Sequence, residues 1–201
     1  MIKIKLSQFC AVINRAASVK SNKDGVSFLS FGVTYPVEGR DGSKKDLDIS
    51  VSLDGDKNQA SVYSEGRRVT IEGNLFIRKH DGRLYFNLRA SKVSLANSKA
   101  EDRFEGSLEF RGKVGKNGVD NKVDKNGSAF KAFSAFSTDK DGDKAEFTWV
   151  RFLYFNPKDG EDFLQAGAYV AVKGDLQLDV YKDAFSLDCR VSEVMPWVLD
   201  K

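Results

Sequence analysis

The feature that most constrains this chain is an internal repeat. Residues 65–95 align without a gap on residues 166–196 when the sequence is shifted by 101 positions. Fixed-period self-similarity indicates a repeated structural unit, and a period this long fits two duplicated domains better than a solenoid. The identical pairs are Gly66/Gly167, Val69/Val170, Gly73/Gly174, Leu75/Leu176, Arg89/Arg190, Ser91/Ser192 and Val93/Val194.

Each copy has the pattern of a small β-protein. One copy contains VTIEGNLFIRKHDGRLYFNLRASKV, which predicts a strand, a tight turn at Asp81-Gly82 and a second strand. Segments 26–33, 47–53, 130–136 and 147–155 alternate in the same way, and turn pairs such as Asp24-Gly25 and Asn126-Gly127 separate them. Only residues 54–64 and 158–165 leave room for a short helix, at equivalent places in the two copies.

Three strands, a short helix or loop, and two further strands is the order of the OB barrel. We therefore predict an all-β protein of two tandem OB-fold five-stranded barrels, each with at most one short helix. The first domain is expected at residues 1–96 and the second at 103–197, joined by a linker at 97–102.

The overall charge of +3 conceals an asymmetry between the halves. Residues 1–97 carry 16 basic and 10 acidic side chains, whereas residues 98–201 carry 16 and 19. A basic half suits an anionic partner. Cys10 and Cys189 lie in different copies and are expected as buried free thiols in a reducing compartment. With no apolar segment long enough for a signal peptide or a membrane span, we expect a cytoplasmic protein, or a phage or mobile-element protein acting in a host cytoplasm.

The third strand of each copy separates a shared face from a divergent one. Alternation predicts that Ile49, Val51 and Leu53, and their matches Val150, Phe152 and Tyr154, point into the barrels. The opposite face is Asp48, Ser50, Ser52 and Asp54 in the first copy, but Trp149, Arg151, Leu153 and Phe155 in the second. Because a soluble barrel gains nothing by showing Trp and Phe to water, this face predicts a partner.

Further aromatic residues extend that face. Phe130 and Phe136 share the outward phase of the second strand, and Tyr181 falls at a hairpin tip in phase with Lys173. Aromatic rings interspersed with Arg151 and Lys173 are typical of a stacking platform for unpaired bases. The alternative is that these rings pack against the other domain or another chain.

Several motifs, taken in order, resemble the bacterial-type single-stranded DNA-binding protein family. Residues 148–155, T-W-V-R-F-L-Y-F, resemble its strand T-E-W-H-R-V-V-x-F, and residues 126–130, N-G-S-A-F, resemble its N-G-x-A-V. Residues 167–176, G-A-Y-V-A-V-K-G-D-L, resemble its K-G-S-x-V-x-V-E-G-x-L, as do residues 65–75 of the first copy. The resemblance implies base stacking by Trp149 and Tyr181, a strand arginine at Arg151 and a base-contacting ring at Phe155.

The first copy departs from that pattern. His80 takes the position of Tyr181, and Asp48 takes that of Trp149. The remaining outward groups suit phosphates, with a solvated hairpin as the alternative. These groups are Arg68, Arg78, Lys79, His80 and Arg83.

Nothing in the sequence favours catalysis. His80 is the sole histidine and neither cysteine is placed to pair with it, so no metal site, cofactor or catalytic residue is predicted. We expect a non-enzymatic protein that binds single-stranded DNA largely without sequence preference, protects it in replication, recombination or repair, and has no membrane or small-molecule partner. If four barrels form the working unit, as the resemblance implies, two chains pair as a homodimer; a monomer is the alternative. The alternatives are a tandem OB-fold protein-interaction module and a binder of single-stranded RNA.

Overall fold

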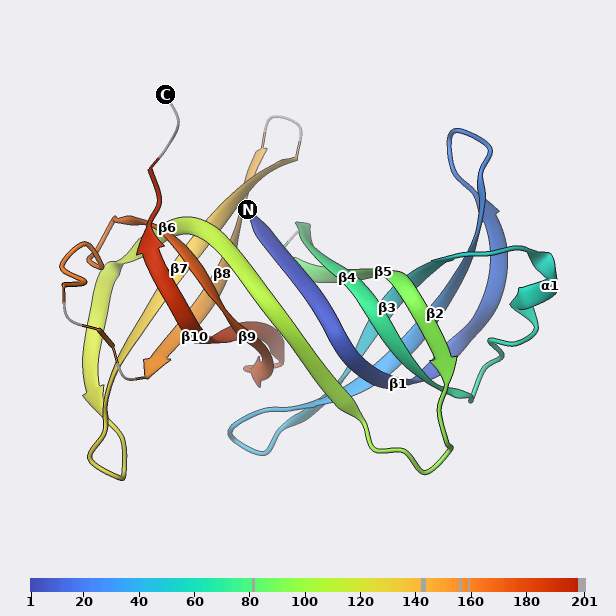
Figure 1. The fold of residues 1–201 in the computed structure, drawn as a ribbon, viewed down its shortest axis with the longest axis horizontal. Helices are drawn as coiled ribbons and strands as arrows, with labels where there is room; N and C mark the ends of the chain where they lie inside the picture. Colours follow the sequence, from blue (N-terminus) through green and yellow to red (C-terminus); the bar gives the residue numbers. More distant parts are fainter. Residues whose placement is uncertain (81, 142–143, 156, 159, 199–201) are drawn as a thin grey trace.

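The structure, a computed structural model, describes residues 1–80, 82–141, 144–155, 157–158 and 160–198 (Figure 1). Within these residues the chain forms ten strands and one short helix, so the all-β prediction is confirmed. The elements are β1 (Ile2–Ser21), β2 (Ser27–Glu38), β3 (Lys44–Asp54), α1 (Lys57–Ala60), β4 (Arg68–His80), β5 (Arg83–Leu95), β6 (Arg103–Val123), β7 (Ala129–Asp141), β8 (Lys144–Phe155), β9 (Tyr169–Tyr181) and β10 (Ala184–Pro196).

The strands of each half pair in the cyclic order of an OB fold. In the first half β1 pairs with β2 and β4, β2 with β3, β4 with β5, and β3 with β5 in parallel. Strands β6 to β10 repeat this order. The parallel seam is short, covering residues 49–53 against 86–90 in one half and 151–153 against 188–190 in the other. Each half is therefore a partly open barrel, which we call the N-terminal and the C-terminal barrel.

Strand alternation places the cores as predicted. Ile49 and Val51 of β3 are buried, and so are Val150, Phe152 and Tyr154 of β8. These buried side chains belong to one hydrophobic core that includes residues of both barrels. Burial of apolar area at about 25 cal/mol per Å² makes this core the main source of stability.

The two barrels are joined by main-chain hydrogen bonds between their first strands. Residues 2–10 of β1 pair antiparallel with residues 103–110 of β6, so that the ten strands form one sheet. Figure 1 shows β1 and β6 lying side by side between the barrels. The Met1 ammonium group extends this junction by donating to the Arg111 carbonyl oxygen at 2.8 Å.

Two of the identical glycine pairs have a geometric cause. Gly66 and Gly167 have φ of +81° and +76°, a region that L-residues avoid. A Cβ on Gly73 would lie closer than 3.0 Å to the Arg89 carbonyl oxygen, and one on Gly174 would meet Arg190 in the same way. The sequence identity at these positions therefore reflects backbone conformation and close strand contact.

The helix prediction holds in the first copy. Asp56 caps α1 through its side chain, which accepts a hydrogen bond from the Asn58 amide at 2.8 Å, and Gln59 completes the capping box. In the second copy, the described residues of 158–165 form turns and irregular loop in place of a helix, and Leu164 among them is buried. Asp81 of the expected tight turn lies outside the described residues. The chain passes from β5 at Leu95 to β6 at Arg103, while the exact domain limits stay a prediction.

Both cysteines are buried free thiols. Burial, with a smaller contribution from the Asp175 carboxylate, raises the pKa of Cys189 to about 12. No helix in the described part of the chain is long and apolar enough to cross a membrane.

We predict that Gly174→Ala destabilises the C-terminal barrel, because its Cβ would meet the backbone of β10 closer than 3.0 Å. Overpacking of this kind costs about 1–3 kcal/mol, so the midpoint of urea unfolding should fall clearly. Ser107→Ala, at the exposed register partner of Asp175, is the matched control and should change little. Equal midpoints for the two variants would contradict this account of the repeated glycine.

Candidate nucleic-acid interface

The C-terminal barrel carries a row of aromatic side chains on the outer face of β7 and β8. Residues 147, 149, 151, 153 and 155 point outward, and along β8 this row is about 26 Å long at ~3.3 Å per residue. Cross-strand pairing sets Phe136 against Trp149, Ser134 against Arg151 and Phe130 against Phe155. The register thus brings together on one face five of the side chains predicted as site residues, namely Phe130, Phe136, Trp149, Arg151 and Phe155.

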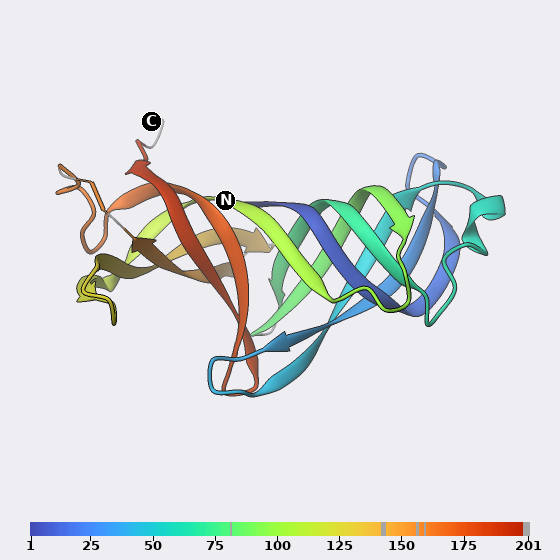
Figure 2. The same cartoon turned by 60° about the horizontal axis from the view of Figure 1, so that its bottom comes forward.

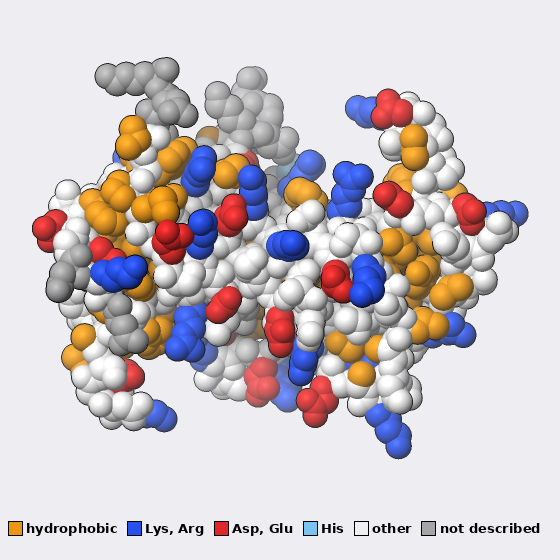
Figure 3. Space-filling view, viewed as in Figure 1, with side chains coloured by type: hydrophobic (Ala, Val, Ile, Leu, Met, Phe, Trp, Pro, Cys, Tyr) orange, Lys and Arg blue, Asp and Glu red, His pale blue; other side chains and the backbone are white. Residues whose placement is uncertain are grey.

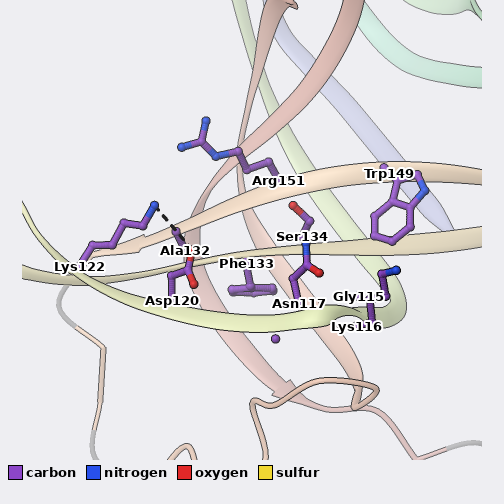
Figure 4. Close-up of a pocket in the computed structure, with 11 residues that line it drawn as sticks. Gly115, Lys116, Asn117, Asp120, Lys122, Ala132, Phe133, Ser134, Trp149 and Arg151 are labelled. Atoms are coloured by element: carbon purple, nitrogen blue, oxygen red, sulfur yellow. Dashed lines mark ion pairs between the residues drawn. The ribbon is translucent and has the colours of Figure 1, made fainter.

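Trp149 is held in place from two sides while about half of it, 48%, stays exposed. Its ring centroid lies 4.9 Å from that of Phe136, at an interplanar angle of 52°. Its Cζ3 lies over the backbone of Gly115, where a Cβ would be only 3.0 Å away (Figure 4). The absence of a side chain at residue 115 therefore lets the indole ring lie against β6, with its remaining surface open to solvent.

The repeat shows what replaces this arrangement in the N-terminal barrel. A shift of 101 positions aligns Asn14 with Gly115 and Asp48 with Trp149. In the first copy, the Asn14 Nδ2 donates a hydrogen bond to the Asp48 Oδ1 at 2.6 Å. Two polar side chains thus occupy the place that the indole ring has in the second copy, so this point of the N-terminal barrel has no stacking surface.

Trp149 and Arg151 stand between two grooves and line both of them. On one side, the bulged segment of β6 at residues 115–118 and the Lys122 side chain form the wall; Lys122 lies 3.6 Å from Asp120 (Figure 4). On the other side lie Tyr181, Asp188 and the Arg40 side chain of the N-terminal barrel. We call these the bulge groove and the inter-barrel groove.

Tyr181 lies where the sequence predicted it, at the tip of the β9–β10 hairpin, and is 62% exposed. The Lys182 ammonium group lies 5.3 Å from the centre of its ring. The structure therefore brings Trp149, Arg151 and Tyr181 to a single groove, although β8 and β9 are not paired with each other in the sheet.

The far end of the row is more closely packed. Phe130 and Phe155 stack with centroids 5.1 Å apart and planes at 24°, and the Arg190 guanidinium lies 5.0 Å from the Phe155 ring. A guanidinium over a ring is a favourable cation–π contact. This end offers two partly buried rings and a cation, whereas the Trp149 end offers a more exposed ring.

Two of the predicted basic residues lie away from the grooves. Lys173 of β9 stands opposite Glu109 and forms an ion pair of 3.1 Å with Glu193. Arg68 lies at the start of β4, about 33 Å along the strand from Arg78 at ~3.3 Å per residue. Arg68 pairs with Asp102, and this hydrogen bond raises its pKa. Both side chains are thus engaged with carboxylates within the chain.

The other predicted basic residues gather on the β4–β5 hairpin. The outward register pairs Arg78 with Tyr85 and His80 with Arg83.

Lys79 of the same hairpin is half-buried, and its Nζ lies 3.4 Å from the Phe147 carbonyl oxygen of β8, so it links the two barrels. Arg78, Lys79 and His80 line a cleft between the barrels that Asp139 and Glu146 line from the opposite side. The predicted phosphate edge therefore faces acidic side chains.

Several exposed aromatic residues were missed in the sequence. Phe147 shares the outward phase of Trp149, and its ring packs edge-on against Phe136 at 5.3 Å. Phe76 and Tyr85 are about half exposed on the β4–β5 hairpin. Phe147 could have been found by extending the alternation of β8 by two residues, and Phe76 by its shared phase with Arg78.

A second missed group surrounds Tyr169 at the start of β9. Register pairing sets Lys113 between Phe136 and Tyr169, and the Lys113 Nζ lies 5.4 Å from the Tyr169 ring centre. Tyr169 packs edge-on against Trp197. Figure 3 shows hydrophobic side chains beside lysine and arginine side chains, with acidic side chains among them, over the C-terminal barrel. The mixed aromatic and basic surface thus continues from β7 across β6 to β9.

The fold and this surface define a class: a tandem OB-fold protein with an outward aromatic face on its second barrel. No family model matches the sequence, and no curated protein matches it significantly. Among solved structures, the chain is similar to the wild-type single-stranded DNA binding protein from Thermus aquaticus, at 13% identity and a TM-score of 0.48, covering 100% of this chain and 95% of that one.

It is also similar to a small single-stranded DNA-binding protein from Streptomyces coelicolor, at 11% identity and a TM-score of 0.38 over 47% of this chain and 95% of that chain. The N-terminal domain of PriB from Thermoanaerobacter tencongensis matches at 19% identity and a TM-score of 0.30 over 46% of this chain and 97% of that chain.

We predict that Gly115→Ala displaces the Trp149 ring, since the added Cβ would lie 3.0 Å from its Cζ3 and 3.3 Å from its Cη2. In a Trp197→Phe background, where Trp149 is the sole tryptophan, its emission should shift to longer wavelength and acrylamide should quench it more strongly. Ser134→Ala, on the neighbouring exposed position of β7, is the control. If both variants keep the emission of the background protein, Gly115 does not support the ring.

Proposed function

We propose that this protein binds single-stranded DNA largely without sequence preference and protects unpaired strands in replication, recombination or repair. The observation that carries the proposal is the half-exposed Trp149 ring, braced by Phe136 and Gly115, with Arg151 two residues away on the same face. Stacking of a base on such a ring contributes about 1–3 kcal/mol and is possible with any base.

The geometry favours unpaired bases over a duplex. Trp149 is bordered by a groove on each side, and the aromatic row continues along β8 to Phe155. A base can stack on these rings only if its own face is free, and the bases of a duplex are already stacked on one another. We therefore expect weak binding to double-stranded DNA.

The charges around Trp149 indicate a modest electrostatic contribution. Arg151 and Lys116 are exposed beside the ring, whereas Lys122 has Asp120 as a neighbour. With about three phosphates neutralised, the slope of log K against log salt would be roughly −2, since each contact contributes ~0.7 on a single strand. Affinity should then fall about 20-fold between 50 and 200 mM salt.

We predict that oligo-dT quenches the Trp149 emission of the Trp197→Phe protein. Trp149→Ala should weaken binding by about 5- to 150-fold, the equivalent of ~1–3 kcal/mol for one stacked base. The measurements are a fluorescence titration for the Trp197→Phe protein and fluorescence anisotropy of labelled oligo-dT for Trp149→Ala. Leu95→Ala removes another half-exposed apolar side chain, from the end of β5, and should leave the affinity unchanged.

The same experiment separates the alternatives. Absence of both quenching and binding at low salt would refute nucleic-acid binding. Tighter binding of a matched RNA oligomer would assign the surface to RNA. A stable oligomer that Trp149→Ala dissociates, measured by sedimentation without nucleic acid, would assign the aromatic face to protein association.

A further inference from the structure

The loop between β2 and β3 of the N-terminal barrel reaches the β9–β10 hairpin of the C-terminal barrel. Figure 2 shows the two hairpins side by side below the barrels. The Arg40 amide donates to the Asp179 Oδ1 at 3.1 Å, and the Arg40 Nε lies 3.2 Å from the Asp179 Oδ2. The guanidinium also forms an ion pair with Asp188 of β10. One arginine thus engages two carboxylates of the other barrel.

The carboxylate of Asp188 gives this contact its importance. Its side chain is only 3% exposed, and a buried carboxylate is unfavourable unless a cation or hydrogen-bond donors compensate it. Arg40 supplies the cation. Asp188 also stands opposite Arg151 in the parallel seam and lines the inter-barrel groove with Trp149. The ion pair therefore lies at the wall of the candidate binding groove.

Additional contacts fix the approach of the two hairpins. The Lys45 Nζ lies 2.9 Å from the Asp183 Oδ1 and 5.4 Å from the centre of the Phe185 ring. Phe185 packs edge-on against Phe86 of the N-terminal barrel at 6.0 Å. A Cβ on Gly39 would lie 2.7 Å from the Val180 carbonyl oxygen, so a glycine is needed for this approach.

The turn at the tip of the β9–β10 hairpin, which these contacts hold, has an unfavourable backbone conformation. Lys182 and Asp183 have φ of +49° and +61°, whereas hairpin turns with two positive φ angles usually contain glycine. Non-glycine residues persist in this region only where their surroundings enforce it. Tyr181 directly precedes this turn, so the orientation of its ring depends on how the turn is held.

We propose that Arg40 is a positioning residue of the C-terminal binding site. Through Asp179 and Asp188 it fixes the hairpin that carries Tyr181, and Tyr181 lines with Trp149 the groove in which an unpaired base stacks. This inference rests on the proposed function. Because two carboxylates already engage its guanidinium, Arg40 acts through the hairpin and contacts no phosphate. The N-terminal barrel thus contributes to binding through its β2–β3 loop.

The test compares Arg40→Ala with Lys44→Ala as the control. Lys44 is an exposed residue of the β2–β3 hairpin, and its Nζ lies 4.0 Å from Glu38 of the same hairpin, so among the described residues it makes no ion pair with the β9–β10 hairpin. The first readout needs no DNA. Hydrogen exchange of the β9–β10 hairpin amides should be at least tenfold faster in Arg40→Ala and unchanged in Lys44→Ala.

The second readout is binding of oligo-dT over a range of salt concentrations. Arg40→Ala should lower the affinity about tenfold without changing the salt slope, and in a Tyr181→Ala background it should have less than a twofold effect. A slope smaller by ~0.7 would identify Arg40 as a phosphate contact and overturn the proposal. Unchanged hydrogen exchange would overturn it as well.

Two further outcomes are decisive. If Arg40→Ala fails to fold because Asp188 loses its cation, Lys45→Ala tests the same hairpin contact and should also speed exchange at the tip; no change would refute the proposal. If exchange accelerates in Arg40→Ala but the wild-type protein binds no oligonucleotide, the proposed function fails, and with it the role of Arg40 in DNA binding, while the hairpin contact stands.

Discussion

The antiparallel pairing of β1 with β6 is the contact on which the remaining arrangement depends. An OB barrel can fold on its own, without another barrel paired to the edge of its first strand. Two such barrels on a flexible linker would have no defined mutual orientation. Here residues 2–10 and 103–110 share a ladder of main-chain hydrogen bonds, which fixes the barrels side by side. Only with that orientation fixed can Arg40 reach Asp179, and Lys79 reach the carbonyl oxygen of Phe147.

Duplication acts differently on the two sides of each strand. Inward positions such as Val51 and Phe152 must fill a close-packed core, so both copies keep apolar residues there. Outward positions need not be apolar. At the Trp149 position the first copy has the charged Asp48, whereas the second copy has an aromatic ring. Asn14 and Asp48 bond to each other in one barrel, whereas Gly115 makes room for an indole ring in the other. The divergence gives the two barrels different surfaces on a shared fold.

Much of the fold could be predicted because the relevant signals are local. Alternation along β3 and β8 specified which side chains point inward, and the repeat supplied the strand order twice. The same alternation brought Trp149, Phe136 and Phe155 to one face. The features that could not be predicted from the sequence depend on contacts between distant segments. Neither the ion pairs of Lys173 and Arg68 nor the approach of Arg40 has a sequence pattern, since each follows from how strands and loops meet in space.

The contact between Gly115 and Trp149 restricts the order in which the second barrel could have acquired its surface. A side chain at residue 115 would lie within 3.0 Å of the ring, so a tryptophan arriving on β8 beside an asparagine such as Asn14 would find its place occupied. Loss of the side chain on β6 has no such prerequisite. A tryptophan in this position of β8 therefore depends on a glycine at residue 115 of a different strand.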